Sequence, residues 1–270
     1  MSGFASDWLA LREPLDLAAR NREVETAFLE NVPAESARIL DLASGAGSTV
    51  AGLKNYFHDP VEWQLTDYDP ALLEIASTRW QGGADCIVTS RQIDLSKNLE
   101  QLSLSEVDAV TTSAFLDLVS DCFLRRLVNF IVEARKPFLA SLTYDGRASF
   151  APANPMDQVL GEALNRHQQT NKGFGPALGP DAAQRAIELF RAAGYEVVSG
   201  KSDWEIDGTR GDFLQEFLGG WLRVGREVGL EASALEAWWQ DRVQRIRSGE
   251  LSMSVGHVDF VAYPQMRRFS

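Results

Sequence analysis

Residues 37–49 combine an apolar run with an acid and two glycines. The segment reads A-R-I-L-D-L-A-S-G-A-G-S-T, so Asp41 lies near the end of a buried-strand pattern and Gly45 and Gly47 form the turn after it. A carboxylate at the tip of a strand, followed by glycines that let the backbone approach a ligand, is how an open parallel sheet presents a small-molecule site. We therefore expect a cofactor-binding enzyme.

The spacing of the glycines discriminates between cofactors. A pyrophosphate-binding turn has the pattern G-x-G-x-x-G, in which the last glycine allows close packing of helix on strand. Gly45 and Gly47 fit this pattern, but Val50 occupies the third position and Gly52 comes two residues too late. This disfavours a nicotinamide or flavin cofactor, and an NAD(P)-dependent oxidoreductase is kept as the alternative enzyme class.

The segment Asp41 to Gly47 resembles the first motif of class I S-adenosylmethionine-dependent methyltransferases, which usually carry glycine where this chain has Ala43. The resemblance implies S-adenosyl-L-methionine as the cofactor. It also implies an α/β fold with a doubly wound, mostly parallel seven-stranded sheet, here with helical insertions. In this arrangement the last strands form an antiparallel end of the sheet.

Three further segments match later stations of that family in order. Asp67-Tyr68-Asp69-Pro70 follows a predicted strand at 62–66, and the resemblance assigns the ribose hydroxyls to Asp67, with Asp69 in reserve. Asp94-Leu95 follows a strand at 86–93, and an acid at this position in the family contacts the adenine amino group. Thr112 and Ser113 follow a strand at 107–111, and residues at this position in the family line the methionine end of the cofactor. The expected cofactor-binding residues are Asp41, Ala43, Ser44, Gly45, Gly47, Asp67, Tyr68, Asp94, Leu95, Thr112, Ser113 and Arg20. An acid after a strand is also a common helix N-cap, so that second reading stays open for each carboxylate.

The order of elements predicts parallel βαβ units. Apolar strand patterns alternate with helical patterns at 47–57, 70–80 and 121–135. A fifth strand is expected at 137–143, a helix at about 181–193, and the last strands at 195–199 and 257–263. We expect one methyltransferase-like domain over residues 1–270.

Three segments decorate this core. Residues 1–36 are expected to form a helical lid segment with a helix from Asp16 to Asn31, from which Arg20 would either pair with the methionine carboxylate or lie on the surface. Residues 144–180 are predicted to be a lid insertion, because the connection is far longer than usual and follows the carboxyl end of a strand. Residues 203–250 are predicted to be a helical insertion.

The candidate catalytic residues lie in the 144–180 insertion. His167 can accept a proton near neutral pH, and Tyr144 and Asp145 directly follow the fifth strand. The alternatives are a histidine that is simply hydrogen-bonded on a helix and a tight turn closed by Asp145-Gly146. Lys172 would either meet an acidic substrate or be a solvated loop lysine.

The 203–250 insertion shows two aromatic-rich stripes at helical spacing, around Trp221 and Trp238. Such stripes are more often core than ligand site. They could also cap the acceptor pocket or form a homodimer surface.

Composition restricts the partners and the compartment. The formal net charge is −12 over 270 residues, which disfavours nucleic acid and anionic membranes. Apolar residues make up 45% of the chain without an uninterrupted membrane-length run. Cys86 and Cys122 lie in apolar segments and are expected to be buried thiols in a reducing cytoplasm, and no metal site is expected.

The expected activity is methyl transfer to the oxygen or nitrogen of a small molecule. Such a transfer is an in-line displacement, so the enzyme gains most by holding the acceptor close and collinear and by excluding water. A methyltransferase-like protein that binds the cofactor or a partner protein without turnover is the non-catalytic alternative.

Overall fold

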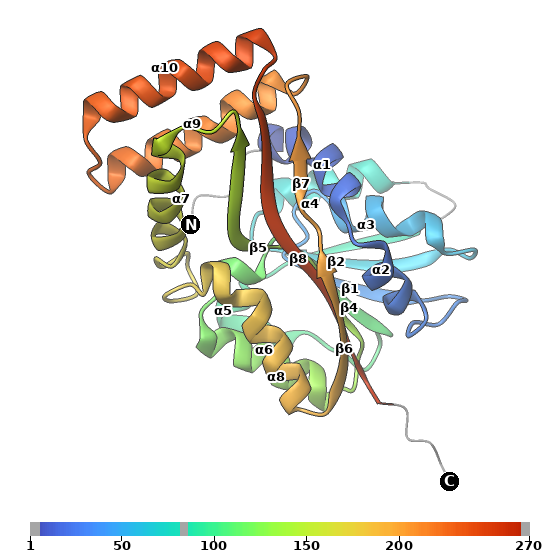
Figure 1. Cartoon of the computed structure of the whole chain (residues 1–270). Coiled ribbons are helices and arrows are strands. Elements are labelled where there is room, and N and C mark those ends of the chain that lie inside the picture. The colour runs from blue at the N-terminus through green and yellow to red at the C-terminus, as the bar shows by residue number, and fades with distance from the viewer. Residues whose placement is uncertain (1–5, 82–85, 266–270) are drawn as a thin grey trace.

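The computed structural model describes residues 6–81 and 86–265, and its centre is one twisted sheet (Figure 1). The strand order is β3-β2-β1-β4-β5-β8-β6, with β7 added to β8 off this path. The strands are β1 (Arg38–Leu42), β2 (Val61–Asp67), β3 (Cys86–Gln92), β4 (Ala109–Ser113), β5 (Phe138–Ala151), β6 (Tyr195–Lys201), β7 (Trp204–Ile206) and β8 (Ser252–Pro264). Only β8 pairs antiparallel with its neighbours, so the predicted doubly wound α/β sheet is confirmed, with β7 as an eighth strand.

Helices cover both faces of the sheet and extend beyond it. They are α1 (Ser6–Ala19), α2 (Arg22–Leu29), α3 (Ser48–Leu53), α4 (Pro70–Trp80), α5 (Leu95–Asn98), α6 (Asp121–Glu133), α7 (Pro155–Gln168), α8 (Ala182–Ala192), α9 (Gly211–Glu227) and α10 (Ala232–Ser248). Short 3-10 turns are η1 (Lys54–Tyr56), η2 (Leu99–Gln101), η3 (Leu116–Leu118) and η4 (Gly179–Asp181). None of the helices in the described part of the chain has the length and apolarity that crossing a membrane requires.

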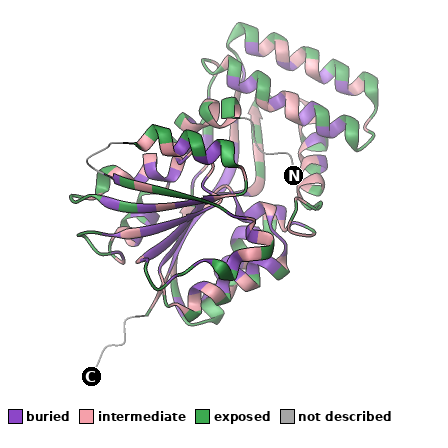
Figure 2. Ribbon diagram, turned by 180° about the vertical axis from the view of Figure 1, so that it is seen from behind, coloured by how far each residue is buried: buried purple, intermediate pink, exposed green. Residues whose placement is uncertain are grey.

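The central strands β1 and β4 are buried on both faces, which explains their apolar patterns (Figure 2). In β1, Leu40 and Leu42 pack with α6 and α8, whereas Ile39 packs with α2, α3 and α4 on the other face. A strand covered on both faces reads as a continuous apolar run rather than an alternating one.

The N-terminus of α6 corrects one prediction. The Ser120 hydroxyl accepts the N–H of Phe123 at 3.3 Å and caps the helix, and Leu124 and Leu127 bury its inner face. Cys122, in the first turn of α6, is exposed, whereas Cys86 is buried as expected. The apolar neighbours of Cys122 belong to the opposite side of the helix, so local composition misplaced it.

β5 is twice as long as the predicted strand at 137–143, and Tyr144 and Asp145 lie inside it rather than in a loop. The strand is irregular there: its register with β8 shifts between Ala140 and Thr143, and Leu142 has a φ of 53°. These irregularities break the period-2 pattern that would have revealed the continuation. The buried carboxylate of Asp259 accepts the N–H of Leu142 at 2.6 Å and so stabilises the bulge.

The predicted helix from Asp16 to Asn31 is two helices. Asn21 separates them, because its side chain accepts the N–H of Val24 at 3.1 Å and caps α2. The N–H of Asn21 itself donates to Asp259 at 2.9 Å. The junction between α1 and α2 is therefore fixed to β8.

Beyond the sheet, β5 and β8 carry α7, α9 and α10, which together we call the helical cap (Figure 1). The stripes around Trp221 and Trp238 are buried inside this chain, so the core interpretation accounts for them. The ends of the α9–α10 pair meet: a Cβ on Gly208 would lie 2.0 Å from the carbonyl oxygen of Gly249.

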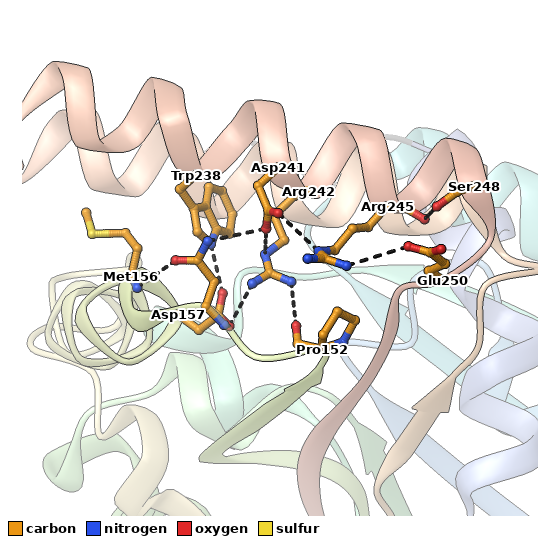
Figure 3. Close-up of polar contacts among 10 residues, drawn as sticks. Pro152, Met156, Asp157, Trp238, Asp241, Arg242, Arg245, Ser248 and Glu250 are labelled. Atoms are coloured by element: carbon orange, nitrogen blue, oxygen red, sulfur yellow. Dashed lines mark hydrogen bonds and ion pairs between the residues drawn. The ribbon is translucent and has the colours of Figure 1, made fainter.

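A fully buried arginine joins α10 to the rest of the cap (Figure 3). Arg242 Nη2 contacts Asp157 Oδ2 at 3.0 Å, and its Nη1 donates to the carbonyl of Pro152 at 2.9 Å. The Trp238 indole N–H donates to the other oxygen of Asp157 at 2.8 Å. One carboxylate at the start of α7 thus holds two residues of α10.

We expect Arg242→Ala to lower the free energy of unfolding by about 3–5 kcal/mol, because it leaves a buried carboxylate without its cation. Urea unfolding followed by circular dichroism measures this. The matched control is Arg245→Gln on the same helix, which breaks partly exposed ion pairs and should cost about 0–1 kcal/mol. Equal losses in the two variants would show that the Arg242 pair has no special role.

Candidate functional site

A cavity of about 310 Å³ opens at the carboxyl ends of β1, β2 and β4. The strand order reverses between β1 and β4, and such a switch point is where open α/β sheets bind ligands. The volume is within the range of small-molecule sites. We call the wall formed by residues 43–46, 48–49, 67–69, 93–95 and 113–115 the cradle; the opposite wall comes from α1, Lys172 and Phe174.

The turn after β1 lines the cradle through Ala43, Ser44 and Gly45. Ala43 has a φ of 51° and Gly45 one of 52°, so the backbone is left-handed at both. The Ser44 hydroxyl oxygen is buried without a hydrogen-bond partner, and a ligand would supply one. Gly47 lies behind this wall, where a Cβ would come within 2.8 Å of the Trp80 indole nitrogen.

Asp41 is placed beneath the turn rather than in the cavity wall. It is fully buried on the face of β1 that carries α3, and its Oδ1 accepts the hydroxyl of Thr111 at 2.7 Å. Burial raises the pKa of Asp41 to about 6, against the opposing effect of the Thr111 hydrogen bond. A hydrogen bond with the Thr49 side chain opposes the shift as well.

Asp67 connects two strand tips. Its Oδ2 accepts the N–H of Gly45 at 2.8 Å, and its Oδ1 accepts the N–H of Asp69 at 2.9 Å. Burial raises its pKa, and these backbone hydrogen bonds oppose the shift. Asp67, Tyr68 and Asp69 all line the cavity, but Asp69 also caps α4 through the N–H of Ala71. Asp67 is therefore the acid available at the tip of β2.

The next two stations also reach the cavity. Asp94 and Leu95 line it, and the Asp94 carboxylate serves at the same time as the N-cap of α5. Lys97 lies 2.8 Å from this carboxylate and holds its pKa below the usual value. Ser113 lines the cavity after β4, whereas Thr112 is buried and donates its hydroxyl to the Leu42 carbonyl at 2.8 Å.

The structure does not place Arg20 in the cavity wall. Its Nε contacts Glu25 Oε1 at 2.6 Å in a buried ion pair, and its guanidinium packs under Gly52 of α3. Arg12, one helix earlier, lines the cavity instead and pairs with Asp16. The prediction began the helix at residue 16, so it did not consider α1 residues before that point.

The three candidate catalytic residues lie outside the cavity wall of the described chain. The Tyr144 hydroxyl donates to Asn165 at 2.8 Å, and Asp145 pairs with Arg147. His167 Nε2 lies 3.2 Å from Glu227 Oε2. Tyr144 and Asp145 are directed away because β5 continues past them into the helical cap.

The opposite wall is tied to the cradle by an ion pair. Arg79 of α4 makes two contacts with Glu13 of α1, at 2.7 and 2.9 Å, and both residues line the cavity. Neither residue appears in a recognisable motif, because their proximity depends on how α1 packs. This pair joins α1 to α4 beside the cavity.

Comparisons with known proteins identify the fold. The YcgJ protein from Bacillus subtilis is similar to this chain with a TM-score of 0.51 and 16% identity, over 91% of this chain and 100% of that one. The Haemonchus contortus phosphoethanolamine N-methyltransferase 2 was solved with phosphomonomethylethanolamine and S-adenosylhomocysteine. It is similar with a TM-score of 0.49 and 14% identity, over 95% of this chain and 57% of that one. The mycolic acid cyclopropane synthase CmaA1, complexed with S-adenosylhomocysteine, is similar with a TM-score of 0.49 and 11% identity, over 88% of this chain and 82% of that one. No family model and no curated protein sequence matches the chain.

The raised pKa of Asp41 predicts a pH-dependent effect on stability. The folded carboxyl ionises near pH 6 and the unfolded one near 3.8, so ionisation opposes folding increasingly as pH rises between these values. Asp41→Asn should therefore gain about 2.4 kcal/mol of unfolding free energy relative to wild type between pH 4 and pH 7. Urea unfolding at both pH values tests this. The control is the partly exposed Asp121, because Arg185 and Arg125 lower its pKa. Asp121→Asn should lose a little unfolding free energy relative to wild type over the same pH range.

Proposed function

We propose that this protein transfers the methyl group of S-adenosyl-L-methionine to a small-molecule acceptor. The observation that carries the proposal is the Asp67 carboxylate, fixed to the N–H of Gly45 in a cavity at the switch point of the sheet. That bond unites the glycine turn of β1 with the acid of β2. The two sequence stations assigned to one nucleoside ligand thus form a single wall.

The residues present fit this cofactor. Asp67 would hold the ribose hydroxyls, Asp94 and Leu95 the adenine, and Ser113 and Phe115 the methionine end, since all line the cavity. One oxygen in the cavity wall, Oγ of Ser44, is buried without a hydrogen-bond partner. Unpaired buried oxygens of this kind are rare and fit a site built to receive hydrogen-bond donors.

The α3 region argues against a dinucleotide. Val50, which replaces the third glycine, is fully buried between α3 and the sheet. α3 spans only six residues, so it offers a weak N-terminus for a pyrophosphate. An NAD(P)-dependent oxidoreductase is accordingly the weaker proposal.

When bound, S-adenosylmethionine supplies a methyl group on a cationic sulfonium. This chain's own contribution is to orient and enclose the reactants. Phe115 and Phe174 line the cavity with their rings 5.4 Å apart and exclude water, and α1 covers the opposite side. A net charge of −12 favours a small acceptor over nucleic acid.

A thermal-shift panel tests the proposed function. Adenosylmethionine and adenosylhomocysteine, each at about 100 times its Kd, should stabilise the protein by about 2.7 kcal/mol. NAD should give no shift. Stabilisation by NAD alone would favour the oxidoreductase, and no response to any of the three would favour a non-catalytic binding role.

Asp67→Ala should weaken adenosylhomocysteine binding about tenfold or more, because a charged hydrogen-bond acceptor is lost. Isothermal titration calorimetry measures this. Asp69→Ala is the matched control, since it lies two residues away and mainly caps α4; its effect on affinity should be smaller. The reverse order would assign the ribose contact to Asp69.

The Glu13–Arg79 pair predicts a kinetic effect. Glu13→Gln should speed the release of adenosylhomocysteine about two- to fivefold, because it removes a partly exposed ion pair between α1 and α4. Stopped-flow displacement measures the rate. An unchanged rate would show that α1 does not have to separate from α4 for release.

A further inference from the structure

Three cationic side chains of the described residues line the cavity, and their pairing differs. Arg12 makes two contacts with Asp16, at 2.8 and 3.1 Å, and Arg79 makes two with Glu13. Lys172 has no carboxylate within 4.0 Å among the described residues. The cavity wall therefore presents one ammonium group that lacks a direct counter-ion.

The segment that carries Lys172 is fixed in place. The Asn171 side chain accepts the N–H groups of Gly173 and Gly175, at 2.8 and 3.2 Å, which closes a turn around the lysine. Phe174 packs edge-on against Phe123, with ring centroids 4.7 Å apart. Lys172 is thus held at the cavity wall by a fixed turn, with its side chain partly exposed.

Behind the lysine stands the histidine that the sequence had suggested as a base. Lys172 Nζ lies 3.5 Å from His167 Nδ1, and His167 Nε2 lies 3.2 Å from Glu227 Oε2. With the ring proton on Nε2, His167 donates to Glu227 and offers Nδ1 as an acceptor to the ammonium. Residues of α7 and α9 thereby orient Lys172 from the helical cap.

The electrostatics favour an anion in front of the lysine. Desolvation lowers the pKa of Lys172, and the charges of Glu227 and Asp117 oppose this shift. Asp117 is buried and does not belong to the cavity wall. Its charge helps to keep the ammonium protonated without occupying the cavity wall. A partly desolvated charge of this kind gains most from an opposite charge.

We propose that Lys172, positioned by His167 and Glu227, binds an anionic group, a carboxylate or a phosphate, on the methyl acceptor. This inference rests on the proposed function, because it assigns the acceptor end of the same cavity. Leu118, Phe115 and Phe174 line the cavity near this end of the site and provide apolar surface. The acceptor class is then a small apolar or aromatic molecule with one acidic group.

Calorimetry on the protein saturated with adenosylhomocysteine tests the proposal with three probes: phenylacetate, phenyl phosphate and the neutral 2-phenylethanol. At least one anion should bind about tenfold tighter than the alcohol, and the preferred anion identifies carboxylate or phosphate as the group. Lys172→Gln should remove this preference, and Lys172→Arg should retain part of it. Affinity for adenosylhomocysteine should stay within about twofold in both. Lys201→Gln, at an exposed lysine outside the cavity, is the control.

A positioning role for His167 has its own signature. His167→Gln should weaken binding of the preferred anion about threefold and leave 2-phenylethanol unaffected, which a general loss of structure would not do. The proposal would be overturned if neither anion bound more tightly than 2-phenylethanol. It would also be overturned if Lys172→Gln kept the preference for the anion. Absence of adenosylhomocysteine binding would instead contradict the proposed function.

Discussion

One buried carboxylate fixes the relative positions of three distant segments. Asp259 in β8 accepts the N–H of Leu142 in the bulge of β5 and the N–H of Asn21 between α1 and α2. Satisfied by backbone donors, it needs no cation inside the core. The bulge redirects β5 into the helical cap, and the α1–α2 junction sets the direction of the helix that covers the cavity. The positions of the helical cap and of the α1 wall therefore depend on this side chain.

The two walls of the cavity hold their charged side chains in different ways. On the cradle, the carboxylates of Asp67, Asp69 and Asp94 accept backbone N–H groups at strand ends and helix starts. On the opposite wall, charges meet as side-chain pairs between elements. Backbone hydrogen bonds are fixed once the sheet forms, whereas side-chain pairs can break and re-form. The cradle is thus the preorganised half of the cavity, and the wall of α1 is the half that can adapt.

Much of the cradle was predictable because its residues follow strands directly. The last residue of a parallel strand and those directly after it lie at the carboxyl edge of the sheet, and Asp67, Ser113 and Ser44 do so. Asp41 and Thr112 were misplaced because each lies one residue before the end of its strand, where its side chain is buried in a packed face.

The opposite wall was not predictable in the same way. Arg12 and Glu13 carry no local motif, and their position depends on how α1 packs across the sheet. The continuation of β5 escaped detection because its bulges interrupt the alternation. Lys172 was recognised as a possible contact to an acid, but only the fold shows that it enters the cavity.

The contact between Gly208 and Gly249 has a consequence for the history of this chain. Because the α9–α10 pair leaves and rejoins the fold at adjacent points, it could be gained, lost or exchanged without moving the strands on either side. Glu227, at the end of α9, belongs to this unit. Exchange of this helical pair among descendants of a common ancestor would therefore offer a route to new selectivity while the cradle is inherited intact.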